Sequence, residues 1–117
     1  MPGASRYDER LAERIRQALA DEKGVTEIKM MGGLCFMLRG HMLGGVHKDE
    51  LIIRVGVEQH AEALARPHAR PMDFTGRPLR GFVLVGRPGF RTAAGLERWL
   101  RRGTAFVSTL PPKRRKG

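Results

Sequence analysis

Between residues 28 and 57 the sequence consists of short apolar runs separated by glycine-rich or polar turns. The runs LCFML, HMLGGV and LIIRVGV have the length and composition of strands, and only Arg39-Gly40 separates the first from the second. A parallel pair of strands needs a crossover of about a dozen residues or more. Strands joined by such short turns must therefore be antiparallel, and this stretch predicts a meander of about three strands.

The segment before the meander has the periodicity of a helix. Ser5 and Asp8 have the spacing of a capping box, and Gly24 is placed to end the helix, so we expect it over about 6–22. Its apolar stripe recurs at spacings of three and four residues. The stripe consists of Tyr7, Leu11, Ile15, Ala18 and Leu19.

The segment after the meander alternates between helical and strand patterns. A short helix-permissive segment follows at 58–65, and a strand pair is expected at 71–74 and 79–85. Thr92 can cap a last helix, in which Gly103 marks a close crossing with a neighbouring element. The apolar face of that helix consists of Leu96, Trp99, Leu100, Phe106 and Val107. The whole order predicts an α+β domain with about five strands, covered by helices on one face.

Charge is distributed unevenly along the chain. Residues 1–65 carry nine Lys/Arg and ten Asp/Glu, a net charge of −1, whereas residues 66–117 carry thirteen and two, a net charge of +11. Two interpretations stay open: a chain rich in arginine that is kept soluble by charge, or a basic surface that attracts polyanions. The run Lys113, Arg114, Arg115 and Lys116, in a tail at 113–117 that we expect to be disordered, is a candidate contact for phosphates.

The composition favours one cytoplasmic domain. A length of 117 residues is typical of a single domain, and a lone cysteine cannot form a disulfide within the chain. No apolar run reaches the roughly 18 residues of a membrane span, and the first ten residues lack the apolar core of a secretory signal. We therefore expect no membrane association and a cytoplasmic location.

Cys35 is the only thiol, and its surroundings favour a structural role. It lies between Leu34 and Phe36 in an expected strand, where a small apolar residue is typical. A nucleophilic thiol needs a base, a helix N-terminus or a cation nearby. A histidine distant in sequence could still approach it, so a small enzyme or ligand-binding domain with a pocket near Cys35 stays open as the alternative function.

Neither the histidines nor the glycine pairs predict a cofactor site. His41 and His47 lie about 20 Å apart on an extended chain, and Pro67 separates His60 from His68, so we expect no metal. The pairs at 32–33 and 44–45 lead into strands, whereas phosphate-binding glycine loops open helices. These glycines instead indicate bulges or close approaches of backbone. No catalytic set and no cofactor is predicted.

Four methionines fall in or beside the expected hairpin. Met30, Met31, Met37 and Met42 are expected as soft filler of the core, and a groove for a partner peptide is the alternative. Asp73 and Arg77 flank a turn, where a capping Asp and a solvated Arg are expected.

Several segments together resemble the TfoX N-terminal domain family. They are KMMGGLCFMLRGHMLGGV, LIIRVG, ARPMDFTGRPLRGFVLV, the late Trp99 and FVSTLPPK, and the match covers roughly residues 7–112 of a domain that we place at 1–112. The resemblance implies a curved antiparallel sheet with flanking helices, similar to secretion-chaperone-like folds. The signature positions, which are expected to be structural, are Gly32, Gly33, Gly40, Asp73, Gly76 and Gly81.

The resemblance also implies a link to natural competence, in which full-length family members act as transcriptional co-regulators with a cyclic-AMP receptor protein. Those regulators carry a second, helical domain, and we expect this chain to be a single-domain member. It implies no catalytic residues. The resulting hypothesis is a non-enzymatic regulatory or interaction module. Its expected partners are a protein of the transcription machinery or a transcription factor, non-specific nucleic acid, and a second copy that docks through an apolar sheet face or edge.

Overall fold

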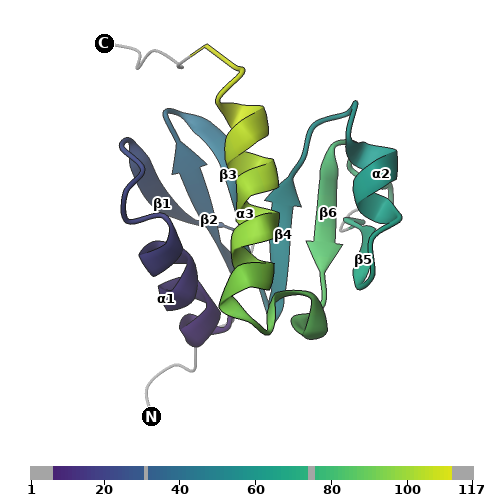
Figure 1. The fold of residues 1–117 in the computed structure, drawn as a ribbon, viewed down its shortest axis with the longest axis horizontal. Coiled ribbons are helices and arrows are strands. Elements are labelled where there is room, and N and C mark those ends of the chain that lie inside the picture. Colours follow the sequence, from purple (N-terminus) through teal and green to yellow (C-terminus); the bar gives the residue numbers. More distant parts are fainter. Residues whose placement is uncertain (1–6, 31, 74–75, 112–117) are drawn as a thin grey trace.

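The computed structural model describes residues 7–30, 32–73 and 76–111, which form three helices, six strands and one 3₁₀ turn (Figure 1). The elements in chain order are α1 (Glu9–Ala18), β1 (Val25–Met30), β2 (Gly33–Leu38), β3 (His41–His47), β4 (Glu50–Arg54), α2 (His60–Leu64), β5 (Ala69–Pro71), β6 (Phe82–Val85), η1 (Arg87–Phe90) and α3 (Ala93–Val107). In the described part of the chain, no helix is long and apolar enough to cross a membrane.

The strands form one open antiparallel sheet in the order β1-β2-β3-β4-β6-β5. The meander and the α+β class are therefore confirmed. The sheet has six strands because residues 25–30 form a complete strand, where the sequence indicated only a short apolar approach at 28–31. The strand expected at 71–74 lies earlier, at 69–71, and the strand expected at 79–85 begins later, at 82, but ends at 85 as predicted.

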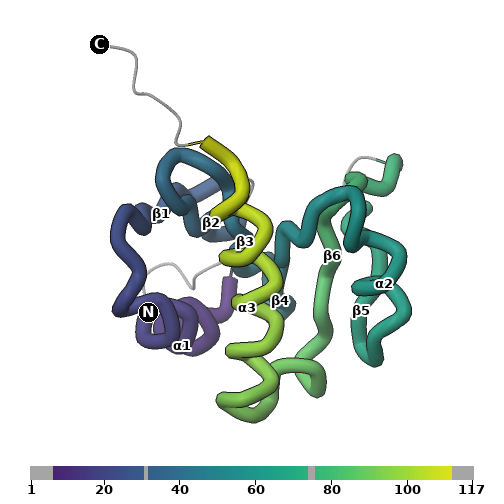
Figure 2. The backbone as a smooth tube through the Cα atoms, turned by 45° about the horizontal axis from the view of Figure 1, so that its top comes forward, coloured from purple at the N-terminus to yellow at the C-terminus, as the bar shows by residue number. Residues whose placement is uncertain are grey.

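The two faces of the sheet differ in what covers them. Helices α1 and α3 lie on one face, as Figures 1 and 2 show, and the main core fills the space between them and the sheet. Its largest fully buried side chains are Phe36, Leu11, Ile15, Leu38, Leu43, Leu51 and Ile53. The opposite, helix-free face carries a smaller cluster of Ile52, Met72 and Leu84.

The glycines of the hairpin allow close approach between strands. A Cβ atom on Gly45 would lie 2.2 Å from the carbonyl oxygen of Leu34, and one on Gly44 would lie 2.2 Å from that of Ile52. Pairing between β2 and β3 also shifts register at Phe36/Met37, which marks a bulge. The interpretation of these glycines as markers of bulges and close contacts is confirmed.

Four of the five signature glycines lie at turns or bends. Gly32, Gly40, Gly76 and Gly81 have φ angles between 78° and 87°, which favour glycine strongly. The predicted close crossing at Gly103 is also confirmed, because a Cβ atom there would lie 2.7 Å from Cδ1 of Leu43.

Helix α1 is shorter than the expected 6–22, and its cap differs. Asp8 is itself the N-cap, since its carboxylate accepts hydrogen bonds from the backbone N–H groups of Arg10 and Leu11 at 2.9 and 3.2 Å. The proposed capping box, with Asp8 three residues inside the helix, is therefore wrong. The helix ends at Ala18 and a turn follows, so Gly24 leads into β1 with a φ of 85° and does not end the helix.

The methionines of the hairpin do not fill the main core. Met30 is 44% exposed, and Met37 and Met42 are half-buried on the helix-free face. Pairing places Met37 opposite Met42, next to the smaller cluster. Met31 lies outside the described residues.

Candidate functional site

Cys35 is buried in β2, on the helix-free face, with 6% of its surface exposed. Its strand partners are Ile28 and Gly45. Burial raises the pKa of the thiol, which lowers the fraction of reactive thiolate at neutral pH. The expectation of a buried cysteine in a strand is therefore confirmed.

A thiol in this position should react slowly with a thiol-specific reagent. We expect labelling of Cys35 in the native protein at neutral pH to be at least about tenfold slower than in denaturant, because the reagent needs exposed thiolate. A time course with a chromogenic disulfide reagent measures this, with glutathione as the unhindered control. Fast labelling of the native protein would contradict burial and support a ligand pocket near Cys35.

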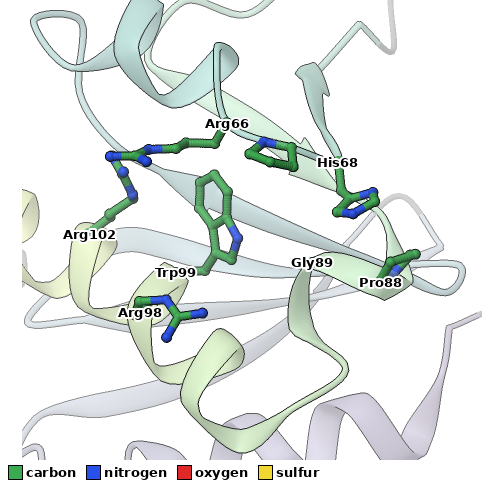
Figure 3. A pocket seen from close by; sticks show the side chains of 8 residues that line it. Arg66, His68, Pro88, Gly89, Arg98, Trp99 and Arg102 are labelled. Atoms are coloured by element: carbon green, nitrogen blue, oxygen red, sulfur yellow. The ribbon is translucent and has the colours of Figure 1, made fainter.

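Two hollows lined by several arginines lie around η1 and the adjoining flank of α3. Thr92 caps α3 by accepting a hydrogen bond from the Gly95 N–H at 2.9 Å. The helix then places Arg98 and Arg102, four residues apart, on one flank, with Trp99 between them turned toward the core. Arg66, from the connection between α2 and β5, reaches the same region (Figure 3).

These side chains line a cavity of about 370 Å³ that contains Trp99, the chain's only tryptophan (Figure 3). Its lining consists of Arg66, Pro67, His68, Pro88, Gly89, Arg98, Trp99 and Arg102. We call it the Trp99 pocket. Three arginines from two distant segments of the chain therefore line one pocket together with Trp99.

Glu62 balances part of this charge. Its carboxylate lies 2.6 Å from Nη1 of Arg102 and 2.8 Å from Nη2 of Arg66. Mainly because Arg102 donates a hydrogen bond to it, the pKa of Glu62 lies below its usual range, and the carboxylate is ionised at neutral pH. Three arginines and one carboxylate leave a net charge of +2 beside the pocket.

Two donors of the Trp99 pocket remain available for a ligand. Arg98 is exposed and has no carboxylate within salt-bridge distance in the described part of the chain. The indole nitrogen of Trp99 lies on the side of the ring that faces His68 and Gly89 (Figure 3), and it donates to no acceptor among the described residues. Arg102 stacks on the same ring, with its Cζ atom 5.2 Å from the centroid.

A second hollow, of about 700 Å³, adjoins the first and shares Pro88 with it. Arg14 connects α1 to η1, because it donates a hydrogen bond to the carbonyl oxygen of Phe90 at 2.8 Å. The carboxylate of Asp8 caps α1, and the first turn of that helix adds the partial positive charge of its N–H groups. The arginines that line the second hollow are Arg10, Arg14, Arg87 and Arg91.

Together the two hollows form what we call the arginine face. It consists of Arg10, Arg14, Arg66, Arg87, Arg91, Arg98 and Arg102. Nη1 of Arg87 lies 3.8 Å from a carboxylate oxygen of Asp49, and Glu62 forms ion pairs with both Arg66 and Arg102. The face therefore has an excess of guanidinium groups, which bind phosphates and carboxylates in a bidentate manner.

Sequence reasoning missed the arginine face. It placed Trp99 correctly on the apolar side of the last helix, and the signal for a pocket was the pattern of Arg98 and Arg102 flanking Trp99 on that helix. The basic tail at 113–116 lies outside the described residues, and so does part of the turn after Asp73. Asp73 itself is exposed.

Comparison with known proteins places the chain in a family. No curated protein and no solved structure gives a significant match. The sequence model of the TfoX N-terminal domain matches residues 17–107, from the last two residues of α1 to the end of α3. The chain therefore belongs to the TfoX N-terminal domain family.

Proposed function

We propose that this chain is a non-enzymatic regulatory module that binds nucleic acid without sequence preference through its arginine face. The observation that supports this most is that seven arginines line two adjoining hollows that share Pro88 of η1, with fewer carboxylates than guanidinium groups around them. Phosphate groups spaced along a nucleic acid would neutralise such a surface and release counterions. Family membership supports a regulatory role, in competence or another transcriptional response, beside a protein partner.

The mode of contact follows from the side chains present. Guanidinium groups of Arg91 and Arg98 would hold successive phosphates, and the indole N–H of Trp99 would donate to a phosphate oxygen at the pocket. Trp99 is only 7% exposed, so its ring has little free surface on which a base could stack. Binding of this kind contacts the sugar-phosphate backbone of the nucleic acid and is insensitive to base sequence.

Replacement of the three exposed arginines of the arginine face that have no carboxylate partner in the described part of the chain tests the proposal. In Arg10→Gln/Arg91→Gln/Arg98→Gln, we expect affinity for labelled duplex DNA to fall at every salt concentration. The slope of log K against log salt should decrease in magnitude by about 2.7, since each phosphate contact contributes about 0.9. Fluorescence anisotropy across a salt series, with duplex DNA and single-stranded RNA, measures both quantities.

A charge-matched variant provides the control. Arg77→Gln/Arg80→Gln/Arg101→Gln removes the same charge outside the arginine face, and all three side chains are exposed. If both triple variants lose affinity equally, net charge and not the arginine face accounts for binding. Neutralising Lys113, Arg114, Arg115 and Lys116 in a third variant separates the tail's contribution, with an expected slope change of about 3.6 if the tail alone makes four phosphate contacts.

Trp99 also supplies an internal probe. Because it is the only tryptophan, a change in intrinsic fluorescence upon DNA binding reports on the Trp99 pocket directly. We expect the change in the native protein and in the control variant, and its loss in Arg98→Gln. Binding that leaves Trp99 fluorescence unchanged would place the nucleic acid elsewhere on the surface.

A further inference from the structure

Strand β1 is an open edge of the sheet. It pairs with β2 on one side, and on its other side Figures 1 and 2 show no further described element. Five of its six residues are exposed. An edge strand with free backbone N–H and C=O groups is a template for pairing with another strand, and natural proteins usually shield such edges.

The side chains of β1 divide sharply between the two faces. Ile28 and Met30 lie on the helix-free face, where they pair with Cys35 and Gly33, and each is 44% exposed. Glu27 and Lys29 lie on the helix-bearing face. Their opposite charges are therefore two residues apart on the same face, with Ile28 between them on the other.

This pattern is complementary to itself. In an antiparallel pair of two β1 strands related by a two-fold axis at Ile28, Ile28 lies opposite its own copy. Glu27 of each chain then lies opposite Lys29 of the other, which gives two cross-strand charge pairs on the helix-bearing face. Thr26 lies opposite Met30, which extends the apolar contact of Ile28 on the helix-free face.

The same charges disfavour the neighbouring registers. Moving the axis by one residue along the strand to Glu27 places Glu27 opposite its own copy, and moving it to Lys29 places Lys29 opposite its own copy. Like charges directly opposite each other destabilise a pair of strands. The alternation of charge on β1 thus selects one register out of those that keep the sheet faces aligned.

Arg16 of α1 strengthens this arrangement. Its Nε atom lies 2.6 Å and its Nη2 atom 2.9 Å from the two oxygens of Glu27, so the carboxylate is held at the edge of the sheet. A carboxylate has enough lone pairs to accept a further charged donor. Lys29 of a second copy would therefore approach an oriented Glu27.

We infer that β1 pairs antiparallel with β1 of a second copy of this chain about a two-fold axis at Ile28, which joins two sheets into one. The interface covers Ile28 and Met30 and satisfies the open backbone groups of both edges. It is distinct from the arginine face, so it stands whether or not nucleic acid binds there.

A charge swap tests the pairing and its register. Glu27→Lys and Lys29→Glu each place like charges opposite each other in a homodimer, and we expect the Kd for self-association to rise roughly ten- to a hundredfold in either variant. An equimolar mixture of the two restores opposite charges across the axis, and it should form a heterodimer with a Kd close to that of the native homodimer. Sedimentation velocity over a concentration series measures each Kd.

Lys23→Glu serves as the matched control, because it makes the same charge change at an exposed lysine outside β1 and should leave the Kd within about twofold. Circular dichroism establishes that each variant is folded, and Lys29→Glu leaves the contact of Arg16 with Glu27 in place. A native protein that stays monomeric up to about 1 mM overturns the proposal. A dimer that both single variants leave unchanged, or a mixture that fails to restore association, overturns it equally.

Discussion

Gly45→Ala should lower the free energy of unfolding by about 3 kcal/mol or more, a large part of the stability of a typical domain. A Cβ atom at this position would lie 2.2 Å from the carbonyl oxygen of Leu34 and 3.1 Å from Cα of Cys35. Both neighbours are backbone atoms of β2, so the strands must separate to accept the methyl group. Urea denaturation followed by circular dichroism and by Trp99 fluorescence measures the change.

Gly86→Ala is the matched control for this substitution. A Cβ atom added at Gly86 would lie 3.8 Å from the carbonyl oxygen of His68 and 3.9 Å from Cδ of Pro88. Both distances are ordinary van der Waals contacts, and the φ of −76° at Gly86 suits alanine. We expect this variant to be unchanged or up to about 1 kcal/mol more stable, since alanine restricts the unfolded chain. Equal stability of the two variants would show that β2 and β3 are not as close at Gly45 as the structure places them.

Phe36→Ala should destabilise the protein by about 3–5 kcal/mol. Phe36 is 1% exposed and lies on the helix-bearing face of β2, opposite Gly44, which has no side chain to fill the space that the ring leaves. The loss of the ring therefore leaves a cavity beneath the helices in the main core. The same denaturation experiment measures the effect.

Phe82→Ala provides the comparison on the other face of the sheet. Phe82 is half-buried beside the smaller cluster, and the guanidinium of Arg54 lies 5.6 Å from its ring centroid. We expect a loss of about 1 kcal/mol, because only part of the side chain leaves an apolar environment. A loss as large as that of Phe36→Ala would mean that the helix-free face contributes to the core as much as the helix-bearing face.

The correct sequence predictions concern residues whose neighbours in the chain decide their structure. The turn Arg39-Gly40 is too short for a parallel crossover, so the direction of β2 and β3 was determined locally. The placement of Cys35 in a buried strand rested on its immediate apolar neighbours. The close contact at Gly103 followed from a single small residue in an otherwise large-residue helical face.

The incorrect predictions concern places where local patterns were ambiguous. Half of the residues of β1 are polar and most are exposed, so its sequence carries a weaker apolar signal than a buried strand. It was expected only as a short approach. The start of α1 depended on whether Ser5 or Asp8 caps it, and both residue types favour that position. Met30 was assigned to the core by its type alone, although its strand lies at the sheet edge.

Local patterns were sufficient to predict the antiparallel meander, the flanking helices, the role of the glycines and the family, because each depends on turn lengths, periodicity and motifs within short segments. Which charges share a surface depends instead on the packing of segments that are distant in sequence. Arg14 reaches a carbonyl 76 residues further along the chain, and Arg66 joins Arg98 and Arg102 across the fold. The order of strands alone places β1 at an edge. These features depend on how distant segments pack, which no local pattern specifies.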